Sequence, residues 1–216
     1  MDKDDKVLGN TVGYRDHRNE GMDEEVYKTI SLEDLYARTG IQKAIFNTVY
    51  QLMAVKTKHP EYLEQAETML HVPDYFHYLL TGKKTCEYTE ATTGQLVNAE
   101  TKDWDYELID KLGYPRKMFQ KLIMPGTSVG HFTEEVKAEV GFDVEVVAPA
   151  THDTGSAVLA VPANDDDFIY ISSGTWSLMG IEREKADCSK KSCEMNFTNE
   201  GLSLIHISEP TRRRGI

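Results

Sequence analysis

The chain has 216 residues and a formal net charge of −12, from 36 acidic and 24 basic side chains. This negative charge argues against a nucleic-acid surface. No apolar run reaches the roughly 18 residues of a membrane span. Residues 1–6 lack the apolar core of a signal peptide. Its three cysteines, an odd number, favour reduced thiols in the cytoplasm. We therefore expect a cytoplasmic globular protein of one large or two small domains, with no nucleic-acid, membrane or obligatory protein partner.

Helical signals dominate the first two thirds of the chain. Ser31, with Asp34 three residues later, resembles a capping box, and Gly40 can end the helix that this box would start. The apolar spacing within residues 49–53 predicts a buried helical face, and Pro60 can open the next helix.

Two later segments carry similar signals. Pro73 can open a helix that Gly82 closes. Asp103 is expected to precede a helix that carries Trp104 and Leu108. Together with the strands described next, these helices predict the α/β class.

The segment 144–163 places ionisable residues at the end of a strand. An apolar run over 144–148 leads to His152, Asp153 and Thr154, and a helix-compatible stretch over 155–161 follows at once. Open α/β sheets place their chemistry where a strand passes into a helix. These residues therefore form the first half of a predicted active site.

A second strand, over 168–171, provides the other half. It turns through residues 172–175 into another apolar strand. Hydroxyl groups and a glycine at such a turn can approach a phosphate closely. A carboxylate on one element and a phosphate-type turn on the next indicate phosphoryl transfer.

Other kinds of site fit the sequence less well. The sequence has no G-x-x-x-x-G-K-[ST] loop, no G-x-S-x-G elbow and no H-E-x-x-H motif. A metal phosphohydrolase would need more ligands than the His152–Asp153 pair, and Asp153 or Thr154 could simply cap the helix that follows. Cys188 and Cys193 lack two further nearby Cys or His ligands, so no metal-binding residue is predicted.

Six segments together resemble the FGGY family of carbohydrate kinases, and FNTVYQL within the second of them indicates the rhamnulokinase branch. They are LGNTVGYRDHR (8–18), RTGIQKAIFNTVYQL (38–52), VPDYFHYLLTG (72–82), PATHDTGSAVLAVPA (149–163), SSGTWSLMGIE (172–182) and NFTNEG (196–201). The resemblance covers about residues 7–201. It implies an actin-like ATPase (ribonuclease H-like) fold, represented by most of the N-terminal domain and the first hairpin of the C-terminal domain.

The resemblance also implies an enzyme, which transfers the γ-phosphoryl group of ATP to the 1-hydroxyl of L-rhamnulose in L-rhamnose catabolism. Asp153 matches the family's general base, which accepts the proton of the sugar hydroxyl as the P–O bond forms. His152 and Thr154 match positions that bind the ketose. Thr175, with Gly174 beside it, matches the position that contacts ATP, and ATP chemistry implies Mg²⁺.

Four further residues lie in segments that border the sugar pocket in related sugar kinases, namely Tyr14, Asp16, Phe46 and Asn47. A packed aromatic ring or a turn-capping carboxylate would explain these residues equally well. Two alternative functions stay open: a kinase of the same family with different ketose specificity, and a non-enzymatic actin-like module.

The polar stretch 164–167 is the expected domain boundary. It would separate a partial N-terminal sugar-binding domain (1–163) from the start of a C-terminal ATP-binding domain (164–201), with the site in the cleft between them. The character of the sequence changes abruptly after Gly201. Residues 202–216 are therefore expected to be a non-native tail that continues no element of the fold. The family's first phosphate loop and its adenosine-binding half are missing from the sequence, so the chain alone is expected to be an inactive fragment of an active enzyme.

Overall fold

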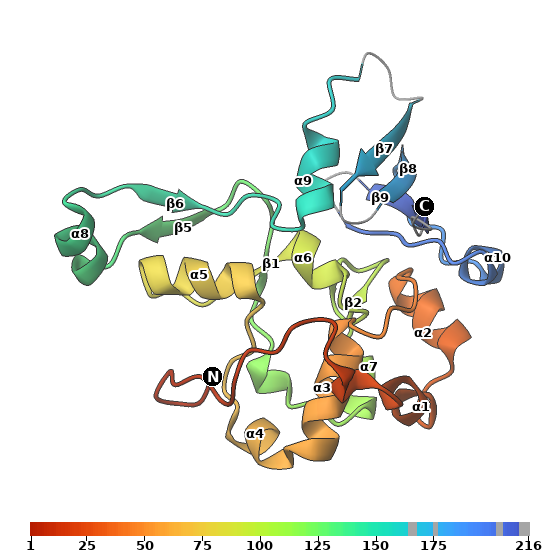
Figure 1. Ribbon diagram of the computed structural model, residues 1–216, viewed down its shortest axis with the longest axis horizontal. Coiled ribbons are helices and arrows are strands. Elements are labelled where there is room, and N and C mark those ends of the chain that lie inside the picture. Colours follow the sequence, from red (N-terminus) through yellow and green to blue (C-terminus); the bar gives the residue numbers. More distant parts are fainter. Residues whose placement is uncertain (164–167, 175–176, 202–204, 212–216) are drawn as a thin grey trace.

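The computed structural model describes residues 1–163, 168–174 and 177–201, and the backbone of 205–211. Its helices are η1 (His17–Asn19), α1 (Met22–Tyr27), α2 (Leu32–Thr39), α3 (Thr48–Lys58), α4 (Pro60–Gln65), α5 (Val72–Thr81), α6 (Tyr88–Thr92), α7 (Tyr106–Lys111), η2 (Arg116–Met118), α8 (Glu134–Val140), α9 (Asp153–Leu159) and α10 (Lys190–Glu194). Helices α1 to α4 and α7 form the lower body of the molecule in Figure 1. Among the residues that the structure describes, no helix has the length and apolar character needed to cross a bilayer.

The strands form small sheets around this body. They are β1 (Cys86–Glu87), β2 (Val97–Asn98), β3 (Asp103–Trp104), β4 (Leu122–Ile123), β5 (Ser128–His131), β6 (Glu145–Val147), β7 (Ile169–Ser173), β8 (Ser177–Arg183) and β9 (Ile205–Thr211). Strands β1 and β4 pair in parallel, while β2–β3, β5–β6 and β7–β8–β9 are antiparallel.

The hydrophobic core lies among the helices of the lower body. Leu108 on α7 and Val49 on α3 are fully buried there. The Tyr114 hydroxyl donates a hydrogen bond to the Val49 carbonyl at 2.8 Å, which satisfies a polar group within the core. Trp104 and Phe119 meet edge to face, with ring centroids 5.0 Å apart. These contacts join α3, β3 and α7 into one packed unit.

Most of the local helix signals are confirmed. Ser31 caps α2, since its side chain accepts the Asp34 N–H at 3.0 Å, and Gly40 ends that helix in the left-handed conformation. Helix α5 has Pro73 in its first turn and ends at Gly82, which is also left-handed. Capping chemistry therefore sets these helix ends as the sequence predicts.

The predicted start of α7 is wrong by two residues. Asp105, not Asp103, is the N-cap, and its carboxylate accepts the Leu108 N–H at 3.0 Å. Trp104 lies instead in β3, opposite Val97. The same Asp105 carboxylate also forms an ion pair with Arg38 at 3.0 Å. This contact joins residues 67 positions apart in the sequence and favours Asp105 as the cap.

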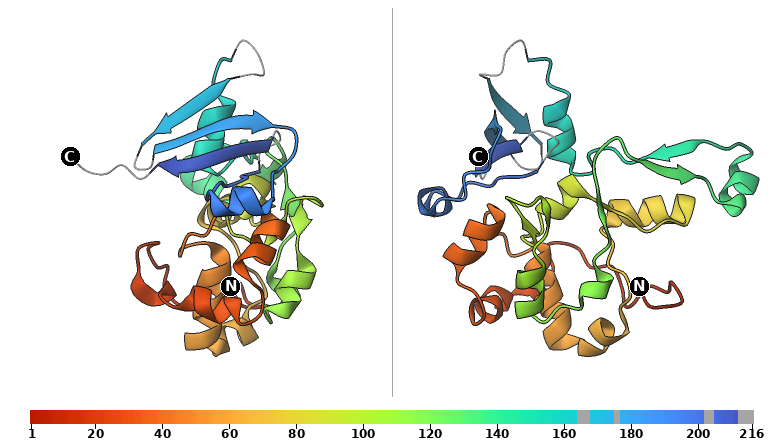
Figure 2. Two further views of the ribbon diagram at one scale, coloured as in Figure 1. Left: turned by 90° about the vertical axis from the view of Figure 1, so that its right-hand side faces the viewer. Right: turned by 180° about the vertical axis from the view of Figure 1, so that it is seen from behind.

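The strand predicted over 144–148 is confirmed as β6, but it does not lie in an open parallel sheet. It pairs antiparallel with β5, and the two strands extend beside α5 as an arm (Figures 1 and 2). Helix α8 sits at the tip of this arm and does not cover its face. Val144 and Val147 consequently stay 43% and 48% exposed.

The hairpin predicted after residue 167 is confirmed as β7–β8. The expectation that residues 202–216 continue no element is wrong for the backbone of 205–211, which forms β9 along the outer edge of β8. The free N–H and C=O groups of an edge strand offer a pairing site to any extended segment. The domain boundaries and the non-native origin of the tail stay predictions.

Removing the side chain of Leu108 tests the packed unit around α7. Leu108→Ala is expected to lower the free energy of unfolding by about 2–5 kcal/mol, because the deletion leaves a cavity in a fully buried position. Leu79→Ala, at a position that is 46% exposed on α5, should change it by less than about 1 kcal/mol. Urea unfolding followed by circular dichroism measures both, and equal losses would contradict this account of the core.

Candidate functional site

Asp153 is the first residue of α9 and its side chain is exposed. One carboxylate oxygen, Oδ1, accepts the N–H of Thr154 at 2.6 Å. Asp153 and Thr154 thus both lie in the first turn of α9, and His152 is the N-cap residue without a side-chain capping bond. The predicted alternative, in which Asp153 or Thr154 caps the helix, is wrong, because His152 is the N-cap and both residues lie inside α9.

The loop before α9 is held by the buried carboxylate of Glu87, which is 0% exposed. Glu87 Oε2 accepts the Thr151 N–H at 3.0 Å and the Thr151 hydroxyl at 2.8 Å. It also accepts the Thr89 hydroxyl and the Glu90 N–H, while Oε1 accepts the Thr89 N–H. Five donors therefore converge on one carboxylate, two from the loop before α9 and three from α6.

Thr89 extends this network to the predicted site. Its hydroxyl oxygen accepts the backbone N–H of His152 at 3.2 Å, while the same hydroxyl donates to Glu87. The backbone on the N-terminal side of Asp153 is thus held at two successive residues. This fixes the direction in which the chain enters α9.

His152 lies between acidic side chains. Its Nδ1 is 3.3 Å from Oε2 of Glu200, and the two side chains are 17% and 16% exposed. Burial raises the pKa of Glu200, and the nearby His152 only partly opposes this effect. Burial likewise raises the pKa of Glu90, which also lies close to His152. Both carboxyl groups therefore keep their protons to a higher pH than a free glutamate would.

The segment 196–201 closes over α6 and the end of α2. The Gly201 N–H donates to the Thr92 hydroxyl at 3.0 Å, and a Cβ at Gly201 would come within 2.6 Å of the Tyr88 ring. The Asn199 side chain donates to the Gly40 carbonyl at 2.8 Å. These contacts bring Glu200 to His152, although 48 positions separate the two residues in the sequence.

The four residues predicted to border a sugar pocket take part in different contacts. Tyr14 meets Phe46 edge to face at 5.5 Å, so these two rings are together. Asp16 caps η1 by accepting the Arg18 N–H. Asn47 is buried and bonds the Ala44 N–H and the Thr93 carbonyl. For Asp16 and Asn47 these bonds match the turn-capping interpretation.

The turn predicted to face ATP is described in part. Gly174 is exposed and follows β7, which packs against α9. Thr175 lies outside the described residues. The exposed Gly174 turn and the exposed Asp153 carboxylate are therefore carried by neighbouring elements.

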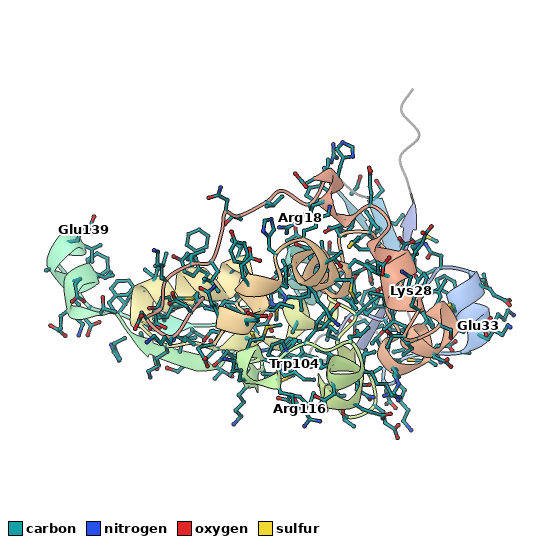
Figure 3. All side chains as sticks on the ribbon, turned by 90° about the horizontal axis from the view of Figure 1, so that it is seen from below. Arg18, Lys28, Glu33, Trp104, Arg116 and Glu139 are labelled. Atoms are coloured by element: carbon teal, nitrogen blue, oxygen red, sulfur yellow. The ribbon has the colours of Figure 1, made fainter. Side chains whose placement is uncertain are left out.

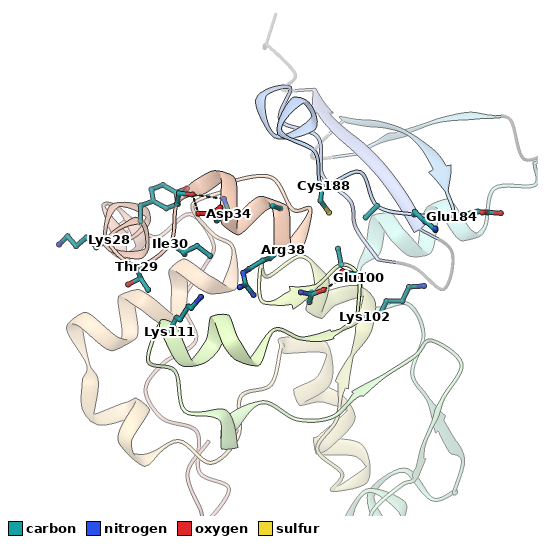
Figure 4. A pocket seen from close by; sticks show the side chains of 17 residues that line it. Lys28, Thr29, Ile30, Asp34, Arg38, Glu100, Lys102, Lys111, Glu184 and Cys188 are labelled. Atoms are coloured by element: carbon teal, nitrogen blue, oxygen red, sulfur yellow. Dashed lines mark hydrogen bonds between the residues drawn. The ribbon is translucent and has the colours of Figure 1, made fainter.

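A cavity of about 1100 Å³ lies elsewhere, between α2 and residues 184–188 (Figure 4). Side chains of both charges line it, among them Arg38, Lys102, Glu100 and Glu184. None of the residues predicted for the site is among those that line it. Its size alone does not make it the place of the chemistry, because it contains neither the Asp153 carboxylate nor the residues that hold it.

Sequence reasoning missed Glu87, Thr89, Glu90 and Glu200. The available signal was a run of acidic and hydroxyl residues, CEYTEATTGQ, at 86–95, in which the carboxylates alternate with small and aromatic residues. That run predicts a helix start, and Glu87 is indeed the N-cap of α6. The contact with Thr151, 64 positions away, leaves no local trace in the sequence.

Replacing Glu87 with its amide tests the buried network. Glu87→Gln is expected to lower the free energy of unfolding by about 2–4 kcal/mol, because an NH₂ group would then face N–H and O–H donors that need an acceptor. Glu139→Gln is the matched control, since Glu139 is exposed on α8 at the far end of the molecule (Figure 3) and should change stability by less than about 0.5 kcal/mol. If urea unfolding gives the same midpoint for both variants, the carboxylate does not hold the loop.

Solved structures of sugar kinases share this fold. The ligand-bound xylulose kinase from Lactobacillus acidophilus superposes with a TM-score of 0.84 at 20% identity, over 97% of this chain and 43% of that one. The glycerol kinase of Plasmodium falciparum with ADP gives 0.80 at 15% identity, over 95% and 42%. The expected α/β fold of the actin-like ATPases is thereby confirmed, for a chain that represents less than half of these proteins.

Curated relatives agree with the structural ones. The rhamnulokinase of Halalkalibacterium halodurans is 54% identical over 201 residues, which are 93% of this chain and 43% of the relative. That of Bacteroides thetaiotaomicron is 43% identical over 202 residues, or 93% and 42%. The model of the N-terminal domain of the FGGY family of carbohydrate kinases matches residues 1–160. The chain therefore belongs to the FGGY family of carbohydrate kinases.

Proposed function

We propose that the chain is part of a kinase that transfers the γ-phosphoryl group of ATP to the 1-hydroxyl of L-rhamnulose and forms L-rhamnulose 1-phosphate. The observation that carries the proposal is the exposed carboxylate of Asp153 at the start of α9, where hydrogen bonds to Glu87 and Thr89 hold the preceding loop in place. The relatives that are 43–54% identical and named rhamnulokinase support the choice of ketose. Because the chain spans about 43% of their length, the activity belongs to the proposal.

Asp153 would act as the general base. A sugar hydroxyl is a poor nucleophile, and a positioned carboxylate accepts its proton while the new O–P bond forms and the bond to the leaving group breaks. Only Oδ1 of Asp153 takes part in the described hydrogen bonds, which are both to Thr154. Among the described residues, Oδ2 accepts no bond, so it is the oxygen assigned to the proton transfer.

His152 and Thr154 would orient the ketose on either side of the base. The backbone bond to Thr89 holds His152 in place, and its Nδ1 lies 3.3 Å from Glu200 Oε2 without a hydrogen bond among the described residues. A residue held in this way keeps its ring available to a sugar hydroxyl. Tyr14 and Phe46, whose rings are in contact, would form an apolar edge of the ketose site, and Asp16 and Asn47 would hold the turns beside them.

ATP would bind on the side of the β7–β8 turn, with Thr175 and Gly174 at its phosphates. The donor, when bound, supplies the phosphoryl group, and Mg²⁺ is the metal that its phosphates need. The residues of this chain fit that role in two respects. Gly174 is exposed in its turn, and the element that carries the turn packs against α9.

A chimera tests the role of Asp153. Residues 1–201 of this chain would replace the matching segment of the rhamnulokinase of Halalkalibacterium halodurans. We expect the chimera to phosphorylate L-rhamnulose, and Asp153→Asn to lower kcat by about 10²–10⁴-fold because the base is lost. The Kd for L-rhamnulose, measured by calorimetry, should change little.

The control for this experiment is Asp143→Asn, since Asp143 pairs with His131 and Lys137 on the arm. It should leave kcat within twofold of the unchanged chimera. Near-normal turnover with Asp153→Asn would overturn the base assignment. Faster turnover of another ketose would favour a different specificity, and a folded chimera without any kinase activity would favour the non-enzymatic module.

A second substitution separates donor from acceptor. Thr175→Val in the chimera is expected to raise the KM for ATP about tenfold or more, since a hydroxyl bond to a charged phosphate is lost. The KM for L-rhamnulose should stay within twofold. Initial rates over a grid of both substrate concentrations give both constants, and a rise confined to the ketose would assign Thr175 to the acceptor side.

A further inference from the structure

A second cluster of chemically active side chains lies behind the Glu87 network. His71 and Asp74 at the start of α5 meet Cys86 of β1, and their donor atoms all lie within 4.8 Å of one another. Asp74 and Cys86 are 0% exposed, and the His71 side chain is 12% exposed. His71 and Asp74 lie 12 or more positions from Cys86 in the sequence, so no short ligand motif marks the cluster.

Two polar atoms of this cluster have no hydrogen-bond partner among the residues that the structure describes. They are Nδ1 of His71 and Oδ2 of Asp74, which face each other at 3.6 Å. This separation is too long for a hydrogen bond. It is close to the roughly 3.4 Å that separates two ligand atoms of a tetrahedral Zn²⁺ ion with bonds of about 2.1 Å. Buried polar atoms of this kind need an explanation.

The other atom of each side chain is already oriented by a neighbour. His71 Nε2 lies 3.4 Å from the Thr48 hydroxyl, and Asp74 Oδ1 accepts the Glu87 N–H at 2.9 Å. Protein metal sites show this arrangement, in which the ring nitrogen or carboxylate oxygen that does not bind the metal is held by a second residue. The Cys86 thiol lies 3.7 Å from the Met69 carbonyl, which is a weak contact.

We propose that His71, Asp74 and Cys86 form a binding site for a thiophilic divalent cation such as Zn²⁺. Its protein ligands are His71 Nδ1, Asp74 Oδ2 and Cys86 Sγ, and water takes the fourth position. An imidazole, a carboxylate and a thiolate are ligands that Zn²⁺ combines in proteins, whereas Mg²⁺ does not favour sulfur. The site is distinct from the one that would serve ATP.

Metal binding at this cluster exchanges a proton for the cation, because a coordinating thiol must be deprotonated and a coordinating imidazole must be neutral. The Cys86 thiol gives up its proton to solvent as the bond between sulfur and metal forms, and His71 binds through the unprotonated Nδ1 of its neutral ring.

Cobalt spectroscopy tests the site in the full 216-residue chain. The variant with Cys188→Ser and Cys193→Ser leaves Cys86 as the remaining thiol of the three. Addition of Co²⁺ should give one bound ion per chain, with thiolate-to-cobalt absorption in the near ultraviolet that Zn²⁺ abolishes by displacement. A hundredfold excess of Zn²⁺ over its Kd should raise Tm by about 5–10 °C.

Single substitutions in that background decide between a built site and chance binding by one thiol. Cys86→Ala should abolish the thiolate absorption, and His71→Ala should weaken Co²⁺ binding at least tenfold while circular dichroism shows an unchanged fold. His59→Ala, at an exposed histidine on the surface, is the control and should bind Co²⁺ normally.

A second measurement does not depend on the folding of the ligand variants. In the Cys188→Ser, Cys193→Ser background, one equivalent of Zn²⁺ should slow alkylation of Cys86 at least tenfold. The absence of a thiolate band would overturn the proposal. So would a band of equal strength in the folded His71→Ala variant, or alkylation that Zn²⁺ does not slow.

Discussion

The arrangement of the candidate site depends on one buried carboxylate. A carboxylate without a cationic partner is costly inside a protein unless hydrogen bonds replace the water that it loses. Glu87 meets this requirement with five donors, which come from the start of α6 and from Thr151. Because no single element supplies enough donors, the carboxylate is satisfied only when the loop before α9 lies against α6. The cost of burying the charge thus specifies the position of that loop.

The same constraint explains why Asp153 is available for chemistry. The backbone before it is fixed by Thr89 and Glu87, so its own side chain is not needed to hold the loop. Asp153 is exposed, whereas Glu90 and Glu200 behind it are half-buried and partial burial raises their pKa values. Exposure thus distinguishes the acid that is assigned to react from the acids behind it.

Local signals in the sequence were sufficient for most helix ends. Ser31, Pro73 and Gly82 act through their own backbone or through a bond within one turn, so their effect can be recognised from neighbouring residues alone. Asp105 was missed as a cap because Arg38, 67 positions away, helps to hold it. Glu87 was missed for the same reason, since its partner Thr151 belongs to another part of the chain. The strand before Asp153 was predicted, but its pairing partner β5 could not be, because an apolar run does not specify its neighbour.

Asp74 links the inferred cation site to the candidate catalytic loop. Its Oδ1 accepts the N–H of Glu87, and its Oδ2 faces His71. A cation that binds Oδ2 would hold Asp74 against β1. Glu87 belongs to the same strand, and its carboxylate accepts the Thr151 N–H. The side chains of Asp74 and Glu87 then connect the cation to the loop that precedes Asp153. Both side chains are fully buried, so neither can move without leaving a polar group unsatisfied. Binding or loss of the cation is therefore expected to change the stiffness of the loop before Asp153.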